Sequence, residues 1–328
     1  MDKQPKLLVV GSLVMDLIVS SSVFPKAGET VLGKSFSTAP GGKGANQALQ
    51  AARLGADVTL VGMVGDDDFG KRLRKSAEES GVNTQWLFTT DKAPTAVGNV
   101  QIREGEQGTE NRIIVVPGAN HVLTEADVAF LKDHISQYDM VILQLEIALS
   151  VNTAVAAMAK AASVPVFLNP APYCPLPQEL LSCLTYICPN EHEGKGLTGV
   201  EPTNEETVRA AAEVLRSMGI PNVLITLGKQ GSYFSGSSGQ QHSRSAEGII
   251  AADPTAAGDS FIGAFCTAVT LGISPAKAME FANCAAGITV SRLGAQPSLP
   301  TLTEVLSLMR NQGMDTTPYE ALNRGKHG

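Results

Sequence analysis

Leu7-Leu8-Val9-Val10-Gly11 is the stretch that decides the fold. Four consecutive apolar residues ending at a glycine are typical of a strand buried on both faces, as in a parallel sheet. Similar runs recur at residues 58–61, 140–143, 164–168, 185–188 and 223–226. Helical periods lie between them, at 45–54, 69–79, 125–135, 153–162 and 205–218, and the C-terminal third turns mostly helical (258–271, 276–291 and 302–310). This alternation predicts an α/β fold, a doubly wound and mostly parallel sheet flanked by helices.

Two segments interrupt the alternation. Residues 14–40 and 95–116 have no helical period and are typical of strands joined by turns. We expect them to form a small β-sheet lid over the carboxyl ends of the main strands, where ligands bind in such folds. A pair of ordinary surface hairpins is the alternative. The predicted core then comprises residues 1–13, 41–94 and 117–328, and residues 311–328 are typical of a loosely held tail.

The composition excludes several classes of protein. With 43% hydrophobic and 17% charged residues, the 328-residue chain can bury a sizeable core. Its net charge of −7, from 25 basic and 32 acidic residues, argues against a nucleic-acid partner. Polar residues interrupt the most apolar region, 140–168, so we expect no membrane span. The polar N-terminus does not resemble a signal peptide, and five cysteines without a CxxC pair are typical of reduced thiols. We therefore expect a cytoplasmic protein.

One glycine pattern is misleading. Residues 194–199 match the dinucleotide fingerprint GxGxxG, but five residues separate it from the preceding strand and a turn follows it. The fingerprint needs its glycines between a strand and a helix, so we interpret this match as accidental. The chain also contains no GxxxxGK[ST] phosphate loop. Any nucleotide must be held in another way.

The stretch from Ala252 to Ala264 carries the strongest chemical signal. Small residues lead up to Gly258, and an apolar, helix-compatible run follows. A helix that begins here has almost no side-chain bulk over its first turn, so its free N–H groups and dipole can bind an anion. Asp259 lies inside that turn. It is either an acid that complements the helix dipole or a general base beside a transferring phosphate.

Polar residues elsewhere suggest a sugar pocket. Residues 40–47, Pro-Gly-Gly-Lys-Gly-Ala-Asn-Gln, form a glycine-dense loop that enters a helix, with Lys43, Asn46 and Gln47 as donors. Asp16, Glu146 and Asn169 each follow a predicted strand. Any one of them could simply cap a turn. Together at the ligand-binding edge of a sheet, they suggest a pocket for several hydroxyl groups.

At these positions the chain resembles the ribokinase family of sugar kinases. The resemblance spans residues 6–310 and rests on Gly11-Ser12 with Asp16, on residues 25–30 and 41–47, on Gln144-Leu145-Glu146, and on Asn169-Pro-Ala-Pro. It continues through residues 190–193, 225–228, 253–259 and 292–298. The resemblance implies a kinase that transfers phosphate from ATP to O5 of D-ribose. The runs at 41–47, 169–172 and 294–298 favour ribose in particular.

The resemblance also implies a role for each matching position. Asp259 matches the catalytic base, and the N–H groups of Ala256, Ala257 and Gly258 match the anion hole. Positions matching ribose contacts are Asp16, Gly42, Lys43, Asn46 and Glu146. Positions matching nucleotide contacts are Asn190, Thr226, Gly228, Gly231, Gly258 and Asn283, and Glu193 matches an acid associated with Mg²⁺ and phosphate. Positions matching a monovalent-cation site, for K⁺, are Asp253, Thr255, Thr289, Arg292, Gly294 and Ser298, most of them through backbone carbonyls.

The chain departs from the family pattern at three positions, and two other functions remain open. Pro254 stands where the family usually has Thr, Val14 replaces a polar residue, and His192 is interpreted as a solvated loop residue. The alternatives are a related kinase for deoxyribose, another sugar or a nucleoside, and a catalytically silent sugar-binding protein. Exposed edge strands invite pairing, and members of the family dimerise through the small sheet, so a homodimer is expected.

Overall fold

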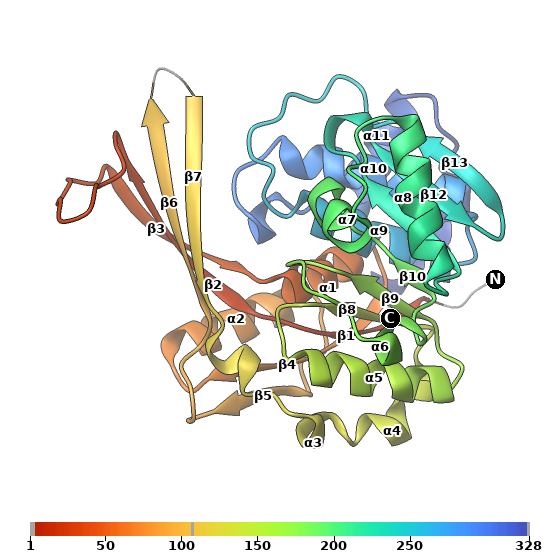
Figure 1. Ribbon diagram of the computed structural model, residues 1–328, viewed down its shortest axis with the longest axis horizontal. Helices are drawn as coiled ribbons and strands as arrows, with labels where there is room; N and C mark the ends of the chain where they lie inside the picture. The colour runs from red at the N-terminus through yellow and green to blue at the C-terminus, as the bar shows by residue number, and fades with distance from the viewer. Residues whose placement is uncertain (1–3, 106–107, 327–328) are drawn as a thin grey trace.

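The computed structural model describes residues 4–105 and 108–326 (Figure 1). Of the ranges predicted above, residues 1–3, 106–107 and 327–328 lie outside the described residues. Among the residues that are described, no helix combines the length and the apolar character needed to cross a bilayer.

One large sheet organises the described chain. Its order is β13-β12-β11-β10-β9-β8-β1-β4-β5. The strands are β1 (Lys6–Val10), β4 (Asp57–Gly65), β5 (Leu87–Thr90), β8 (Met140–Gln144), β9 (Val166–Asn169), β10 (Tyr186–Ile187), β11 (Asn222–Thr226), β12 (Ser232–Gly236) and β13 (Gly239–Ser243). In this sheet β5, β4, β1, β8, β9, β10 and β11 run parallel, and β12 and β13 are antiparallel. The predicted mostly parallel sheet is confirmed.

The apolar run that opens the chain supplies both faces of this sheet. Leu7 and Val9 belong to one buried core, while Leu8 and Val10 belong to the other. Alternate residues of a strand point to opposite faces, which is why a central strand needs an unbroken apolar run. The first core is covered by α1 (Lys43–Arg53), α2 (Asp68–Glu79), α9 (Ala257–Thr270), α10 (Pro275–Val290) and α11 (Leu302–Asn311). The second is covered by α3 (Glu125–Val128), α4 (Leu131–His134), α5 (Leu149–Ala161), α6 (Gln178–Leu181) and α8 (Glu205–Ser217).

A small separate sheet stands apart from these layers (Figure 1). Its strands are β2 (Val14–Ser21), β3 (Ser35–Gly41), β6 (Val97–Gly105) and β7 (Gly108–Val116), in the order β3-β2-β6-β7. In Figure 1 this sheet projects past the ends of the main strands, with β7 at one edge. The predicted second sheet is confirmed. That it acts as a lid stays a prediction.

Three local predictions were wrong. The predicted tail, 311–328, is packed over part of its length, because Tyr319 and Leu322 are buried in the first core. The helix predicted over 125–135 is divided into α3, α4 and a 3₁₀ turn, Ile135–Gln137. A spacing of three between apolar residues suits a 3₁₀ turn as well as an α-helix, so the pattern could not separate them.

The third error concerns the segment that carries the misleading glycine pattern, because residues interpreted as a loop form the helix α7 (Glu191–Thr198). Gly194 and Gly196 lie in this helix, and Gly199 is its left-handed C-cap, where the chain leaves the helix. A Cβ on Gly196 would lie 2.8 Å from the ring of Tyr173, which explains that glycine by packing. The match is therefore accidental, as interpreted, and His192 is an exposed helix residue rather than a loop residue.

Candidate active site

A buried carboxylate lies at the centre of the candidate site. Asp259 is in the first turn of α9 and is 7% exposed. Asn46 donates to its Oδ2 and Gln47 to its Oδ1, each at 2.9 Å. Both donors come from the first turn of α1, so two helices far apart in the sequence meet at this acid. Their close approach depends on Gly263, where a Cβ would lie 2.9 Å from the Gln47 carbonyl oxygen.

The surroundings make Asp259 a stronger base than an ordinary aspartate. Burial raises its pKa, and the carboxylate of Glu146 adds to the rise. Lys43 and the two amide donors lower it, but burial outweighs them. Burial alone would lower the pKa of Lys43, but the nearby carboxylates of Asp259, Glu146 and Glu193 outweigh burial, and the pKa of Lys43 is raised. Lys43 therefore carries a positive charge among three acids.

Gln47 also links Asp259 to two strand ends. It donates to Asn169, the last residue of β9, at 3.2 Å, and it accepts from Gln144, the last residue of β8, at 2.7 Å. This network orients Gln47 through both ends of its amide. Sequence reasoning noted Gln47 as a donor but did not place it among the site residues. Its position beside Asn46 in a first helical turn was the available signal.

Glu146 caps the N-terminus of α1. Its Oε2 accepts from the Ser12 hydroxyl at 2.6 Å and from the Lys43 N–H at 3.0 Å. The Ser12 oxygen in turn accepts from Gly44 N at 3.3 Å. A carboxylate satisfies free N–H groups at a helix start and complements the dipole. Glu146 is thus built into the site, and Ser12, which sequence reasoning quoted without assigning it a role, holds it there.

Asp16 lies on β2 between two glycines. Its cross-strand partner on β6 is Gly98, where a Cβ would lie 2.4 Å from Oδ1, and a Cβ on Gly41 of β3 would lie 2.7 Å from Oδ2. Both neighbouring strands therefore leave room for this carboxylate. Burial, with Glu146 nearby, raises the pKa of Asp16 to about 6. A group that is costly to ionise gains from ligand hydroxyls that donate to it.

Two further features fit a polyhydroxyl ligand. Gly42 has φ 94° at the N-cap of α1, and a Cβ there would lie 2.7 Å from Val14 N, so only glycine suits this position. Among the buried side-chain atoms of the described residues, Asn46 Oδ1 has no hydrogen-bond partner. A buried acceptor without a donor costs free energy unless a ligand or water supplies one. The amide therefore has an acceptor available beside the base.

The start of α9 is open on the side of Gly258. A Cβ on Gly258 would meet no atom within 4 Å. Ala256, the N-cap, has the left-handed values φ 61° and ψ 8°. Ala257 N donates weakly to the Pro254 carbonyl at 3.3 Å, so one of the three predicted anion-hole donors already has a partner. The bare first turn of a long helix remains suited to an anion.

Five of the six predicted nucleotide-contact residues lie at the start of α7, at the end of β11, in the 3₁₀ turn that follows it and on α10, and the sixth, Gly258, lies in the first turn of α9. Asn190 caps α7, and Thr226 N donates to the Pro189 carbonyl, which places the end of β11 beside that cap. Gly228 (φ 49°) is exposed, while Gly231 (φ 94°) is packed so closely that a Cβ would lie 2.1 Å from the Ser243 carbonyl oxygen. We interpret Gly231 as a structural glycine and Gly228 as the open one.

Asn283 has a bracing role. Its amide nitrogen lies 2.9 Å from the Ser243 hydroxyl and 3.1 Å from the Arg244 carbonyl oxygen. It also lies 3.2 Å from the Ser232 hydroxyl. Asn283 thus ties α10 to the end of β13 and the loop that follows.

Glu193 is compatible with Mg²⁺ that arrives with a nucleotide. Its carboxylate accepts from Asn190 N at 2.9 Å and from Asn190 Nδ2 at 3.0 Å, and burial raises its pKa. The described residues contain no cluster of three acidic, His or Cys side chains that could hold a metal. Mg²⁺ commonly uses one or two carboxylates and takes its other ligands from phosphates and water, so this donor set fits a substrate-borne ion.

Two loops meet at the predicted monovalent-cation positions. Asp253 accepts from Thr255 at 2.6 Å and from Gly294 N at 2.9 Å. Ala252 N and Asp253 N donate to the Val290 carbonyl. Two side chains point elsewhere: Arg292 pairs with Glu304 at 2.5 Å, and Thr289 donates within the core. Ser298 donates to the Ala295 carbonyl at 2.6 Å. The paired loops offer the hard oxygen atoms that fit an alkali cation.

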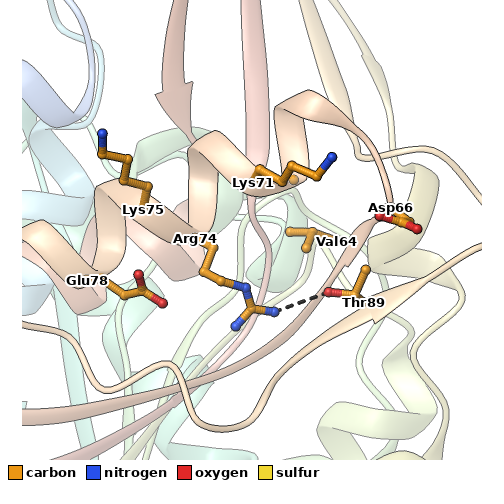
Figure 2. A pocket seen from close by; sticks show the side chains of 9 residues that line it. Val64, Asp66, Lys71, Arg74, Lys75, Glu78 and Thr89 are labelled. Atoms are coloured by element: carbon orange, nitrogen blue, oxygen red, sulfur yellow. Dashed lines mark hydrogen bonds between the residues drawn. The ribbon is translucent and has the colours of Figure 1, made fainter.

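A cavity of about 280 Å³ beside α2 is not part of this site (Figure 2). Its basic side chains are already paired: Arg74 donates to Thr89, Lys71 lies near Asp68, and Lys75 lies near Glu79. None of the predicted site residues lines it. The cavity belongs to the edge of the sheet at β5.

The sequence and the fold are similar to those of known kinases. A family model described as pfkB family carbohydrate kinase matches residues 4–302. Ribokinase of Haemophilus influenzae is 40% identical over 307 residues, covering 93% of this chain and 98% of the relative. Ribokinase of Bacillus subtilis is 40% identical over 303 residues, covering 92% and 99%. The solved structure of Arabidopsis thaliana ribokinase with ribose and ATP superposes with a TM-score of 0.88 at 34% identity, covering 94% and 99%. The chain belongs to the pfkB family of carbohydrate kinases.

Proposed function

We propose that the protein transfers the γ-phosphoryl group of ATP to O5 of D-ribose, giving D-ribose 5-phosphate and ADP. The observation that carries this proposal is the buried Asp259 carboxylate, held by Asn46 and Gln47 at the start of α9. The unpartnered Asn46 Oδ1 lies on the same amide. The similarity to ribokinases over nearly the whole chain supports ribose as the sugar.

The residues suggest how the reaction proceeds. Asp16, Gly42, Lys43, Asn46 and Glu146 would bind the sugar, with carboxylates accepting from its hydroxyls. Asp259 would accept the proton of the 5-hydroxyl as that oxygen bonds to the γ-phosphorus and the bond to the β-phosphate oxygen breaks. Because the transition state of phosphoryl transfer is loose, orienting the hydroxyl matters more than the strength of the base. The two amides that fix Asp259 supply that orientation.

The phosphate side depends on the backbone. The N–H groups of Gly258 and Ala256 would surround the transferring group at the positive end of the α9 dipole, and that of Ala257 would join them on leaving its weak bond to the Pro254 carbonyl. Mg²⁺, bound with ATP near Asn190 and Glu193, would neutralise charge on the β- and γ-phosphates. Thr226 and Gly228 would line the nucleotide, Gly231 would shape the turn beside them, and Asn283 would hold the adjoining loop.

A sugar-dependent ADP-release assay tests the proposal. D-ribose is expected to give the highest kcat/KM in a panel with deoxyribose, fructose and adenosine. A preference for another member would assign the protein to a different substrate within the family. No turnover of any member, with ribose still bound, would favour a silent sugar-binding protein.

We further propose K⁺ as an activator at the loops that Asp253 joins. Pro254 removes an N–H and a hydroxyl beside Asp253 but leaves the carbonyl, so the site is expected to persist with altered strength. Initial rates in K⁺ and Na⁺ buffers of matched ionic strength test this directly. Equal rates at every concentration would contradict it.

Homodimerisation through the small sheet is a further part of the proposal. Strand β7 lies at its edge and exposes Ile113, Ile114, Val115 and Val116, and Phe36 of β3 is 67% exposed. Exposed apolar edge strands pair readily with another chain. Sedimentation is expected to show a dimer, and Ile114→Lys is expected to weaken it. A wild-type monomer at working concentration would refute the assignment.

A cytoplasmic location is the last part of the proposal. Its support is that all five cysteines are free in the structure. Free thiols persist in a reducing compartment. Fractionation of cells that express the full chain tests it.

A further inference from the structure

The C-terminal segment, defined here as residues 312–322, is packed against α10. Tyr319 is fully buried, and its ring stacks on Phe281 with centroids 4.5 Å apart and planes at 13°. Its hydroxyl donates to the Lys277 carbonyl at 2.7 Å. Asp315 lies 3.7 Å from the Lys277 ammonium group. The segment is thus attached to one helix by stacking, hydrogen bonding and charge.

The same segment reaches the far end of α1. Leu322 is buried, and a Cβ on Gly55 would lie 2.4 Å from the Leu322 carbonyl oxygen. Gly55 follows Leu54, the C-cap of α1. Arg310, in the last turn of α11, donates to Thr316 at 3.2 Å. The C-terminal segment therefore contacts both the helix that carries Asn46 and the helix that carries Asn283.

Asn283 lies between the residues that the segment contacts. Phe281 stacks on Tyr319, and the Cys284 sulfur lies 4.0 Å from that of Met314. Asn283 braces Ser243 and Arg244, as described above. A shift of α10 would therefore move this loop.

The segment also contacts the loop directly. Gln312 donates to the Glu247 carbonyl at 3.0 Å. A cavity of about 780 Å³ lies between the three parts, lined by Ser243 to Ser245 and Glu247 on one side, by Met279 of α10, and by Gln312 and Met314. The family match ends at residue 302, so the segment lies beyond it.

We propose that the C-terminal segment positions the nucleotide-binding side of the site, with Tyr319 and Gln312 as positioning residues. Tyr319 fixes α10 and through it Asn283, while Gln312 holds the loop at Glu247. Neither residue needs to touch the nucleotide. This inference rests on the proposed function only in taking the region around Asn283 as part of the ATP site.

Direct binding of MgATP tests the inference without relying on turnover. In Tyr319→Ala, the Kd for MgATP by calorimetry is expected to rise roughly two- to thirty-fold, the range for residues that couple to a ligand without contacting it. The Kd for ribose is expected to stay within about twofold, because α1 keeps its contacts with α9. Tyr319→Phe, which keeps the stack, should recover most of the affinity for MgATP.

Tyr138→Ala is the matched control. Tyr138 is also buried, and its hydroxyl donates to Thr59 at 2.9 Å, but it belongs to the core on the other face of the sheet. It should lower the melting temperature without changing the Kd for MgATP. Should Tyr319→Ala not fold, Gln312→Ala, a half-buried position, is expected to weaken MgATP binding in a stable protein.

Two outcomes would overturn the inference. One is an unchanged Kd for MgATP in both Tyr319→Ala and Gln312→Ala. The other is a parallel loss of ribose and MgATP binding, which would indicate general loosening. Failure of the proposed function has a different signature, namely wild-type protein that binds MgATP but phosphorylates no sugar. In that case the comparison of MgATP affinities still decides the role of the segment.

Discussion

The sugar side of the site is formed mainly by side chains, whereas the phosphate side is formed mainly by the backbone. On the sugar side, side chains hold one another: Asn46 and Gln47 fix Asp259, and Ser12 fixes Glu146. On the phosphate side the main elements are backbone conformations, the left-handed Ala256 and the open Gly258. A side-chain network loses function when one group changes. A backbone cradle tolerates changes in side-chain chemistry but not added bulk or altered dihedral angles.

Asp259 lies where the two sides meet, and its loss should have the largest effect. Asp259→Asn preserves the shape but removes the base, so kcat is expected to fall by about a thousandfold, within the range for general-base catalysis. The Kd values for ribose and MgATP should stay within about threefold, since binding uses other groups. Steady-state kinetics and calorimetry measure both.

Asp67→Asn is a control for that substitution. Asp67 caps α2, accepting from Gly70 N at 2.8 Å and from Thr95, away from the candidate site. Asn is also a good N-cap, so kcat should be unchanged. A near wild-type rate for Asp259→Asn would show that Asp259 is not the catalytic base. The amides of Asn46 and Gln47 would then have no part in catalysis through Asp259.

Gly258→Ala tests the phosphate side alone. A methyl group there meets no protein atom within 4 Å, so the protein should fold with normal stability. It would project into the space proposed for the phosphoryl group and displace it, and kcat/KM for MgATP is expected to fall by about a hundredfold. Ribose affinity should not change. A variant with wild-type kcat/KM would show that the phosphoryl group does not pass over Gly258.

Asp16→Asn tests the sugar side through its pH dependence. Since the pKa of Asp16 is about 6, its carboxyl group is protonated at lower pH and loses an acceptor. In the wild type, KM for ribose should therefore rise as the pH falls from 7 to 5. Asp16→Asn should raise KM about tenfold at pH 7, as expected for one lost charged hydrogen bond, and should remove this pH dependence. A pH dependence retained in the variant would assign it to another group.

The same contrast explains which parts of the site could be predicted from the sequence. The buried strands could be predicted because both of their faces need apolar residues. Asp259 could be predicted because it is an acid in the first turn of a helix that otherwise begins with small residues. Gln47 and Ser12 were not assigned, because their roles depend on partners far along the chain, Gln144 at a separation of 97 residues and Glu146 at a separation of 134. The role of a residue can be predicted when it follows from the residues beside it in the sequence, but not when it depends on a distant partner.

Two errors had signals that went unused. Asn190 followed by Glu193 forms a capping box, which marks the start of α7, but Gly194 and Gly196 obscured the helix. Tyr319 and Leu322 are three residues apart, so they lie on the same side of a 3₁₀ helix and can be buried together. Because the residues around them are mostly polar, the sequence was interpreted as a loose tail. The C-terminal segment owes its order to tertiary packing more than to local propensity.

The smallest effect is expected at Ala256, where the cradle itself is strained. A non-glycine residue in the left-handed region costs about 1 kcal/mol, which glycine relieves at the expense of about the same entropy in the unfolded chain. Ala256→Gly should therefore unfold in urea at the wild-type midpoint or slightly above it. Ala257→Gly, one residue into α9, has no strain to relieve and should lose about 0.5–1 kcal/mol. An equal loss in both variants would mean that Ala256 is not held in a strained conformation, and the phosphate side would then owe its shape to Gly258 alone.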